Sequence, residues 1–139
     1  MARRHWLASA SLTSVLALTV WACGDDGSPT GPSGGGGGGG GGGTAVETTT
    51  ITLTGAGATP QNIIVNAGAR VTFTNNDSRV HEPSSNPHPS HTQCPELNVG
   101  RLEPGQSRES GAAVGGRTCG FHDHLDPSNG SFGGSVQQR

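Results

Sequence analysis

The sequence predicts an all-β fold for its C-terminal part, because the hydrophobic pattern there has the period of strands. Residues 50–54 (Thr-Ile-Thr-Leu-Thr) and 70–74 (Arg-Val-Thr-Phe-Thr) alternate polar and apolar side chains, as half-buried strands do. No window offers ten residues of helical period with caps. Several short strands separated by turn residues are typical of a β-sandwich or barrel.

The first three strands are expected at residues 50–54, 62–65 and 70–74. A turn at residues 55–60, which contains two glycines and a proline, separates the first two strands. The second strand ends at Asn-Ala-Gly, residues 66–68, and the third ends before Asn-Asn-Asp at 75–77. These turn residues set the length of each strand.

The second half of the domain is less regular. Four prolines in residues 82–96 favour a loop there, because proline lacks an amide hydrogen and has a fixed φ angle. Short strands are expected at residues 97–102, 107–114, 117–119 and 134–137, the last of them at a sheet edge.

The N-terminal segment, residues 1–22, has the pattern of a secretion signal. Arg3 and Arg4 precede a mostly apolar stretch that is short for a membrane span. The stretch ends in Val-Trp-Ala-Cys23, which resembles a bacterial lipobox, so we expect cleavage before Cys23 and lipidation of its thiol. An ordinary secretory signal cut nearby is the alternative. Both place the mature protein outside the cytoplasm, and the lipid would anchor it at the periplasmic face or the cell surface.

Residues 23–44 are predicted to form a flexible tether. Ten consecutive glycines at 34–43 have no side chains to bury and high backbone entropy. A segment of about 20 such residues has a reach of about 25 Å. Residues 45–139 then remain for one small domain.

The charge balance excludes nucleic acid as a partner. The chain has no lysine, and without Arg3 and Arg4 six arginines face ten acidic residues. The mature protein is therefore mildly acidic and has no basic patch. Aromatic residues are scarce, so the core is thin, and a bound metal or a disulfide would help to stabilise it.

Metal-ligating side chains are concentrated between residues 81 and 124. Imidazole and thiolate are the ligands that copper and zinc prefer. The tightest group is Cys-Gly-Phe-His-Asp-His at 119–124. We therefore predict a metal site in this region. It contains every histidine of the mature chain and both cysteines other than Cys23, which are His81, His88, His91, Cys94, Cys119, His122 and His124.

These motifs resemble those of the cupredoxins, the small blue-copper proteins such as plastocyanin. The resemblance implies a cupredoxin-like Greek-key β-sandwich, preceded by the signal peptide and the Gly-rich linker. It also implies one bound copper ion and no enzymatic activity. The serines agree with this, because none lies in a pattern with a general base and a residue that orients that base, as nucleophilic catalysis requires. The matching segments are residues 60–68, 71–77 followed by His81, 102–106, 119–122 as the C-x-x-H of the ligand loop, and 134–136.

The resemblance further implies His81, Cys119 and His122 as copper ligands for one-electron transfer to a redox partner protein. The family's axial methionine is missing, because the only methionine is Met1 and Phe132 occupies roughly its place. The axial position is then empty, filled by a backbone carbonyl, or taken by His124 or Glu82. We expect only one of His122 and His124 to face the metal, and the resemblance favours His122.

The alternative is a non-redox module on the same fold, with a disulfide between Cys94 and Cys119. Secreted cysteine pairs usually join, and closing a loop of about 25 residues would stabilise the fold by about 3–4 kcal/mol. The disulfide would remove the thiolate that copper needs. Such a module would store copper or exchange it with a donor or acceptor through the loop histidines His88 and His91, or serve as a metal-free interaction domain. Otherwise His88 and His91 are solvent-exposed loop residues.

Overall fold

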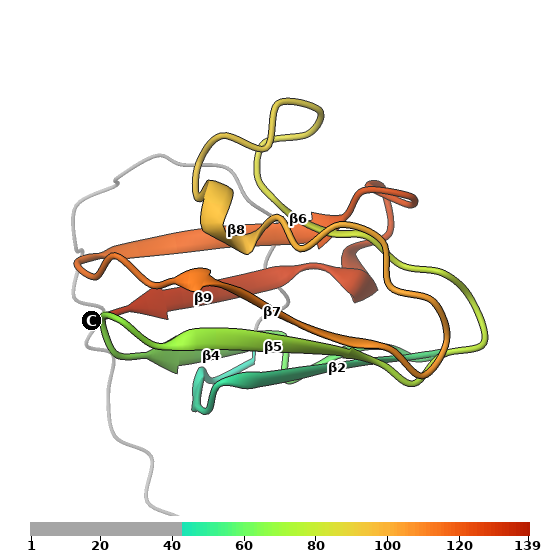
Figure 1. Ribbon diagram of the computed structural model, residues 1–139, viewed down its shortest axis with the longest axis horizontal. Coiled ribbons are helices and arrows are strands. Elements are labelled where there is room, and N and C mark those ends of the chain that lie inside the picture. The colour runs from blue at the N-terminus through green and yellow to red at the C-terminus, as the bar shows by residue number, and fades with distance from the viewer. Residues whose placement is uncertain (1–42) are drawn as a thin grey trace, which may run out of the picture. The chain divides into compact units, whose positions relative to one another are not determined.

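The computed structural model describes residues 43–139, which form a sandwich of two β-sheets (Figure 1). The strand order is β1-β4-β9-β8-β6 in one sheet and β3-β2-β5-β7 in the other. Within the described residues there is no α-helix; two short 3-10 helices are present, η1 (Pro95–Leu97) and η2 (Gly130–Phe132). The all-β prediction is confirmed. The predicted signal peptide and most of the tether lie outside the described residues.

The five-stranded sheet contains residues 119–122, the C-x-x-H sequence. In it β4 pairs in parallel with β1 and β9, whereas β8 pairs antiparallel with β9 and β6. Its strands are β1 (Val46–Glu47), β4 (Asn62–Val65), β9 (Gly134–Gln138), β8 (Arg117–Asp123) and β6 (Pro83–Ser85).

The four-stranded sheet closes the other side of the core. Here β2 and β5 are parallel, and β3 and β7 pair antiparallel with them. Ile51 and Leu53 of β2 and Phe73 of β5 are buried between the sheets, as their alternation predicts. The strands are β3 (Gly57–Thr59), β2 (Thr50–Thr54), β5 (Arg70–Asn75) and β7 (Ser107–Ala112).

The predicted strands agree best with the structure in the first half of the domain. Strands β2 and β4 coincide with the predicted ranges, and β5 is one residue longer than predicted. The expected turn at 55–60 is wrong in part, because β3 forms inside it and pairs with β2. Strand β6 forms in the proline-rich segment, where Pro83 is tolerated because β6 is an edge strand.

Two later predictions are wrong. The segment 97–102 is not a strand: η1 ends at its first residue, and only Leu102 pairs, in an isolated bridge with His81. Strand β9 is not at an edge but lies between β4 and β8. It is central because its Val136 is fully buried and both of its neighbours bond to it.

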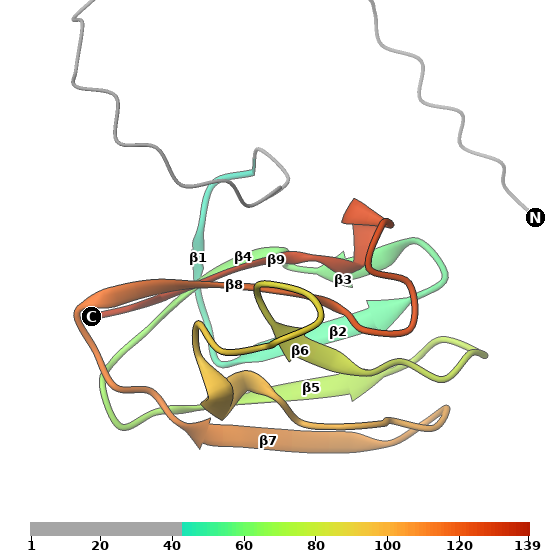
Figure 2. The same ribbon diagram turned by 90° about the horizontal axis from the view of Figure 1, so that it is seen from above.

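Strand β8 determines how the metal-binding residues are arranged. It runs from Arg117 to Asp123, so the C-x-x-H sequence lies within a strand and not on the loop that the resemblance implied. Side chains alternate along a strand, so Cys119, Phe121 and Asp123 face the core, whereas His122 faces outward. The segment between β6 and η1 lies over the outer side of this sheet (Figures 1 and 2). It carries His88 and His91.

Candidate metal centre

Cys119 is bonded to Cys94 and cannot serve as a thiolate ligand. The two residues form a disulfide with their Cα atoms 5.9 Å apart and 25 positions apart in the sequence, and both side chains are buried. A disulfide sulfur carries no thiolate charge, which is the form that binds copper. The prediction of Cys119 as a copper ligand is therefore wrong in this structure, and the cysteines are paired as in the alternative.

His81 lies inside the sandwich between two carboxylates. It is 1% exposed. Its Nδ1 is 2.7 Å from Oδ2 of Asp123, and its Nε2 is 3.0 Å from Oδ2 of Asp77. The ring also stacks on Phe132, with 4.5 Å between the ring centroids. Both ring nitrogens are thus hydrogen-bonded, and neither is free for a metal.

The three predicted ligands do not converge on one point. Asp123, which contacts His81, is four residues beyond Cys119 on β8, a distance of about 13 Å along a strand. His122 lies on the other face of the same strand. The predicted set of His81, Cys119 and His122 is therefore corrected: these residues do not fit one copper ion.

Four other histidines do converge, on the outer side of the five-stranded sheet. His88, His91, His122 and His124 form what we call the histidine cluster, with 4.7 to 5.7 Å between the centroids of contacting rings. Two of them come from the loop after β6, and two come from β8 and the residue just after it. Apart from His81, these are all the histidines within residues 43–139.

His122 and His124 lie on the same side of the chain. His124 is the first residue of the turn that follows β8, and its amide donates to the carbonyl of Glu82 at 2.9 Å. The rings of His122 and His124 both contact those of His88 and His91. These positions do not support the expectation that only one of the two faces a metal, which stays a prediction.

Three of the cluster's side chains are close enough for one ion to bridge them. One ligand nitrogen each of His88, His91 and His124 lies within 4.8 Å of the other two, and Nδ1 of His124 is 3.1 Å from Nε2 of His91. His88 is exposed, whereas His91 and His124 are half-buried. The expectation of isolated, exposed loop histidines thus fails for His91, which packs against His122 and His124.

The surroundings of His91 and His122 favour the neutral form of these two imidazoles. Burial lowers the pKa of His122 and of His91, and the neighbouring histidines lower both further. A neutral imidazole has a nitrogen lone pair to offer, whereas a protonated one must first lose its proton. At neutral pH these side chains are therefore ready to bind a metal.

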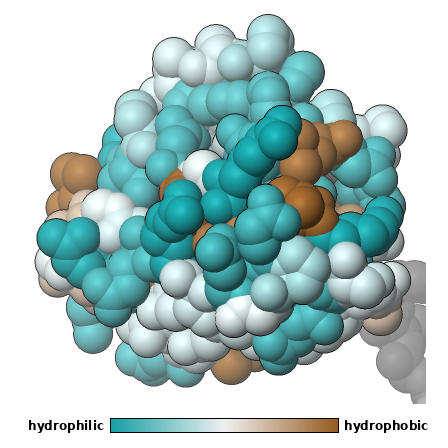
Figure 3. All heavy atoms as spheres, turned by 45° about the vertical axis from the view of Figure 1, so that its right-hand side comes forward, coloured by the Kyte–Doolittle hydropathy of each residue, from teal (hydrophilic) through white to brown (hydrophobic). Residues whose placement is uncertain are grey.

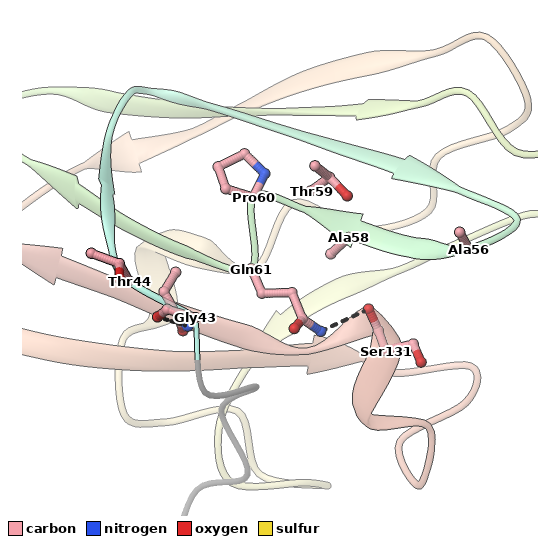
Figure 4. A pocket seen from close by; sticks show the side chains of 9 residues that line it. Gly43, Thr44, Ala56, Ala58, Thr59, Pro60, Gln61 and Ser131 are labelled. Atoms are coloured by element: carbon pink, nitrogen blue, oxygen red, sulfur yellow. Dashed lines mark hydrogen bonds between the residues drawn. The ribbon is translucent and has the colours of Figure 1, made fainter. Parts of the chain in front are cut away.

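Within residues 43–139, one further pocket has no histidine, cysteine or carboxylate in its lining. This pocket of about 390 Å³ beside Gln61 is lined by small and uncharged residues, and the Gln61 amide donates to the carbonyl of Ser131 at 3.1 Å (Figure 4). The face drawn in Figure 3 is mostly hydrophilic, with separate hydrophobic patches. Within residues 43–139 no helix is long and apolar enough to cross a membrane.

Comparison with known proteins identifies the fold. No protein-family model matches the sequence, and no curated protein sequence matches it. Among solved structures, the chain is similar to a purple cupredoxin from Nitrosopumilus maritimus, at 23% identity and a TM-score of 0.54, over 66% of this chain and 100% of that one. It is also similar to plastocyanin from the fern Dryopteris crassirhizoma, at 20% identity and a TM-score of 0.50, over 65% and 99% of the two chains.

The described domain is thus a cupredoxin-like β-sandwich, as the resemblance implied. At these identities the likeness concerns the fold. Two of the three residues that the resemblance assigned to copper are occupied otherwise, by a disulfide at Cys119 and by two carboxylates at His81. The histidine cluster is the group of side chains whose donor chemistry fits copper.

Proposed function

We propose that this domain binds one copper ion through the histidine cluster and holds it for storage or delivery. The observation that supports this most is the approach of His88, His91 and His124, whose ligand nitrogens lie within 4.8 Å of one another. Metal–imidazole bonds of about 2.0 Å require ligand nitrogens about 3.3 Å apart in a tetrahedral site. His88 is exposed, so its side chain has room to move as the three nitrogens close around an ion.

The donor set favours copper. Imidazole suits copper, zinc and nickel, whereas magnesium and calcium prefer oxygen ligands. Copper(II) binds most tightly among the divalent ions of its row. With nitrogen donors and no thiolate, the bound ion would lack the intense sulfur-to-copper absorption of a blue site.

One-electron transfer, the first hypothesis from the sequence, is less well supported. It needs the thiolate of Cys119 beside His81, but Cys119 is in the disulfide and His81 is bonded to Asp123, four residues further along β8. We therefore favour the non-redox alternative on the same fold, with a copper donor or acceptor as the partner.

We also propose that the domain works outside the cytoplasm, anchored through lipid on Cys23. The buried Cys94–Cys119 disulfide supports an oxidising compartment, since disulfides persist there and are rare in the cytosol. The glycine tether would hold the cluster clear of the membrane surface, where a soluble or membrane-bound copper protein can reach it.

Copper titration of the disulfide-intact domain against a competing chelator tests this function. We expect one copper ion per domain and an affinity loss of at least about tenfold in His91→Ala and in His124→Ala. Ser90→Ala is the matched control, because Ser90 lies between two cluster histidines on the same loop and its exposed hydroxyl makes only local contacts. Wild-type affinity in both histidine variants would overturn the proposal.

A further inference from the structure

We infer that His122 is a fourth ligand of this centre, binding through Nε2, and that Asn86 is the residue that positions it. The inference rests on the proposed function and deepens it. His122 is only 8% exposed. Among the described residues, its Nε2 is the buried side-chain nitrogen or oxygen atom that has no hydrogen-bond partner. Buried polar atoms are rarely left unpaired, and a bound ion is one of the partners, besides water, that such an atom can have.

The hydrogen bond to Asn86 determines what that nitrogen offers. Nδ1 of His122 lies 2.7 Å from Oδ1 of Asn86. Because an amide oxygen only accepts, the imidazole proton is on Nδ1, and the lone pair is on Nε2. Metal-bound histidines have this arrangement, in which the second ring nitrogen donates to a fixed acceptor.

The His122 ring packs against two other rings of the cluster. The centroid of the His122 ring is 5.1 Å from that of His91 and 5.6 Å from that of His88. Water is nearly excluded from Nε2, whose accessible area is below 1 Å². His122 is outside the group whose ligand nitrogens lie within 4.8 Å of one another, so the rings would shift to let an ion bound to His91 and His88 supply the partner that Nε2 lacks.

Gly120 makes room for Asn86. A Cβ atom at residue 120 would overlap the side-chain amide nitrogen of Asn86 and lie 3.1 Å from its Cγ. The Asn86 backbone is held as well: its amide donates to the carbonyl of Gly120 at 2.9 Å, and its carbonyl accepts from Gln93 at 2.9 Å. The amide oxygen that orients His122 is therefore fixed before any metal binds.

The fourth ligand changes what the centre can do. Three protein ligands leave a position open to water or substrate, as in catalytic sites, whereas four close the coordination shell, as in structural sites. With His122 bound, the centre holds its ion without an exchangeable water. This arrangement favours holding the metal over catalysis at it.

Variants of Asn86 separate a positioning role from a purely structural one. Asn86→Leu removes the acceptor and keeps the branched shape with the same number of heavy atoms, whereas Asn86→Asp keeps the acceptor. In the metal-free protein, ¹⁵N spectra of the imidazoles should report a single His122 tautomer in the wild type and in Asn86→Asp, and a mixture in Asn86→Leu. Copper affinity should fall about 10- to 100-fold in Asn86→Leu and stay close to wild type in Asn86→Asp.

An open coordination position is the second measurement, with cobalt(II) as the probe metal. The visible bands of the wild type should not change when azide is added, whereas those of His122→Ala should shift as azide replaces the water at its open position. If His122→Ala and Asn86→Leu keep wild-type spectra and affinity while His91→Ala and His124→Ala lose them, the inference is wrong and the proposed function stands. If all four variants bind as the wild type does, both are wrong.

Discussion

The Nδ1 atom of His81 lies 2.7 Å from a carboxylate oxygen of Asp123, in the interior of the sandwich. On the other face of β8, the neighbouring His122 belongs to the histidine cluster. One strand thus separates a buried histidine–carboxylate group from a set of imidazoles in contact with one another. The metal site that we propose is on the outer side of the sheet.

The interior group should resist conversion to a blue copper site. Phe132 stacks on His81 at roughly the place where the resemblance expects an axial methionine. Phe132→Met restores that residue type, but the His81 nitrogens remain bonded to Asp123 and Asp77. We expect no intense visible band in the copper-loaded variant. If such a band appeared and was lost again when His81 was replaced, copper would have displaced the carboxylates from His81.

The disulfide should contribute a large part of the stability of this thin core. Replacing both cysteines, as Cys94→Ala with Cys119→Ala, should lower the free energy of unfolding by about 3–4 kcal/mol, because a closed loop of about 25 residues restricts the unfolded chain. Denaturant unfolding of the two proteins measures the difference. Thiol counting on the unreduced protein is the companion measurement, and two reactive thiols besides Cys23 would contradict the disulfide.

Stability should fall in acid through Asp77. Its hydrogen bond to His81 lowers the pKa of this carboxyl from 3.8 to about 2. Burial raises the pKa, and the contacts with Ser78 and Arg79 lower it further. A carboxyl whose pKa is lower in the folded state stabilises the fold above the unfolded pKa. That contribution is lost as the pH falls from about 4 to about 2.

Asp77→Asn tests this assignment, because the amide cannot ionise. The free energy of unfolding of the wild type should drop more steeply than that of the variant between pH 4 and pH 2. Parallel curves for the two proteins would mean that Asp77 does not carry this part of the acid sensitivity.

Local pattern was enough to predict much of the fold. The alternation in 50–54 and 70–74 located β2 and β5, because each buries one face against the other sheet. The turn residues at 55–60 could not predict β3, because this strand forms only by pairing antiparallel with β2. Nor could local pattern show that β9 is central, which depends on pairing with β4, some 70 residues earlier in the sequence.

The site was harder to predict, because its contacts are distant in sequence. Asn86 and His122 are 36 residues apart, and no local pattern joins them. Two signals were nevertheless present. The period of two places His122 and His124 on one face, and a glycine inside a strand, Gly120, often marks a close approach by another group. The C-x-x-H spacing pointed to a ligand loop, but in this chain it forms part of a strand.

The spectrum of the copper-loaded, disulfide-intact protein tests the central claim most directly. If the histidine cluster binds the copper, we expect an electron paramagnetic resonance signal with nitrogen couplings from imidazole and no intense thiolate-to-copper band in the visible region. Both properties should persist in Cys119→Ser, and the nitrogen couplings should be lost or reduced in His91→Ala. An intense visible band that disappears in Cys119→Ser would contradict binding by the histidine cluster and would place the copper at Cys119, in the interior of the sandwich.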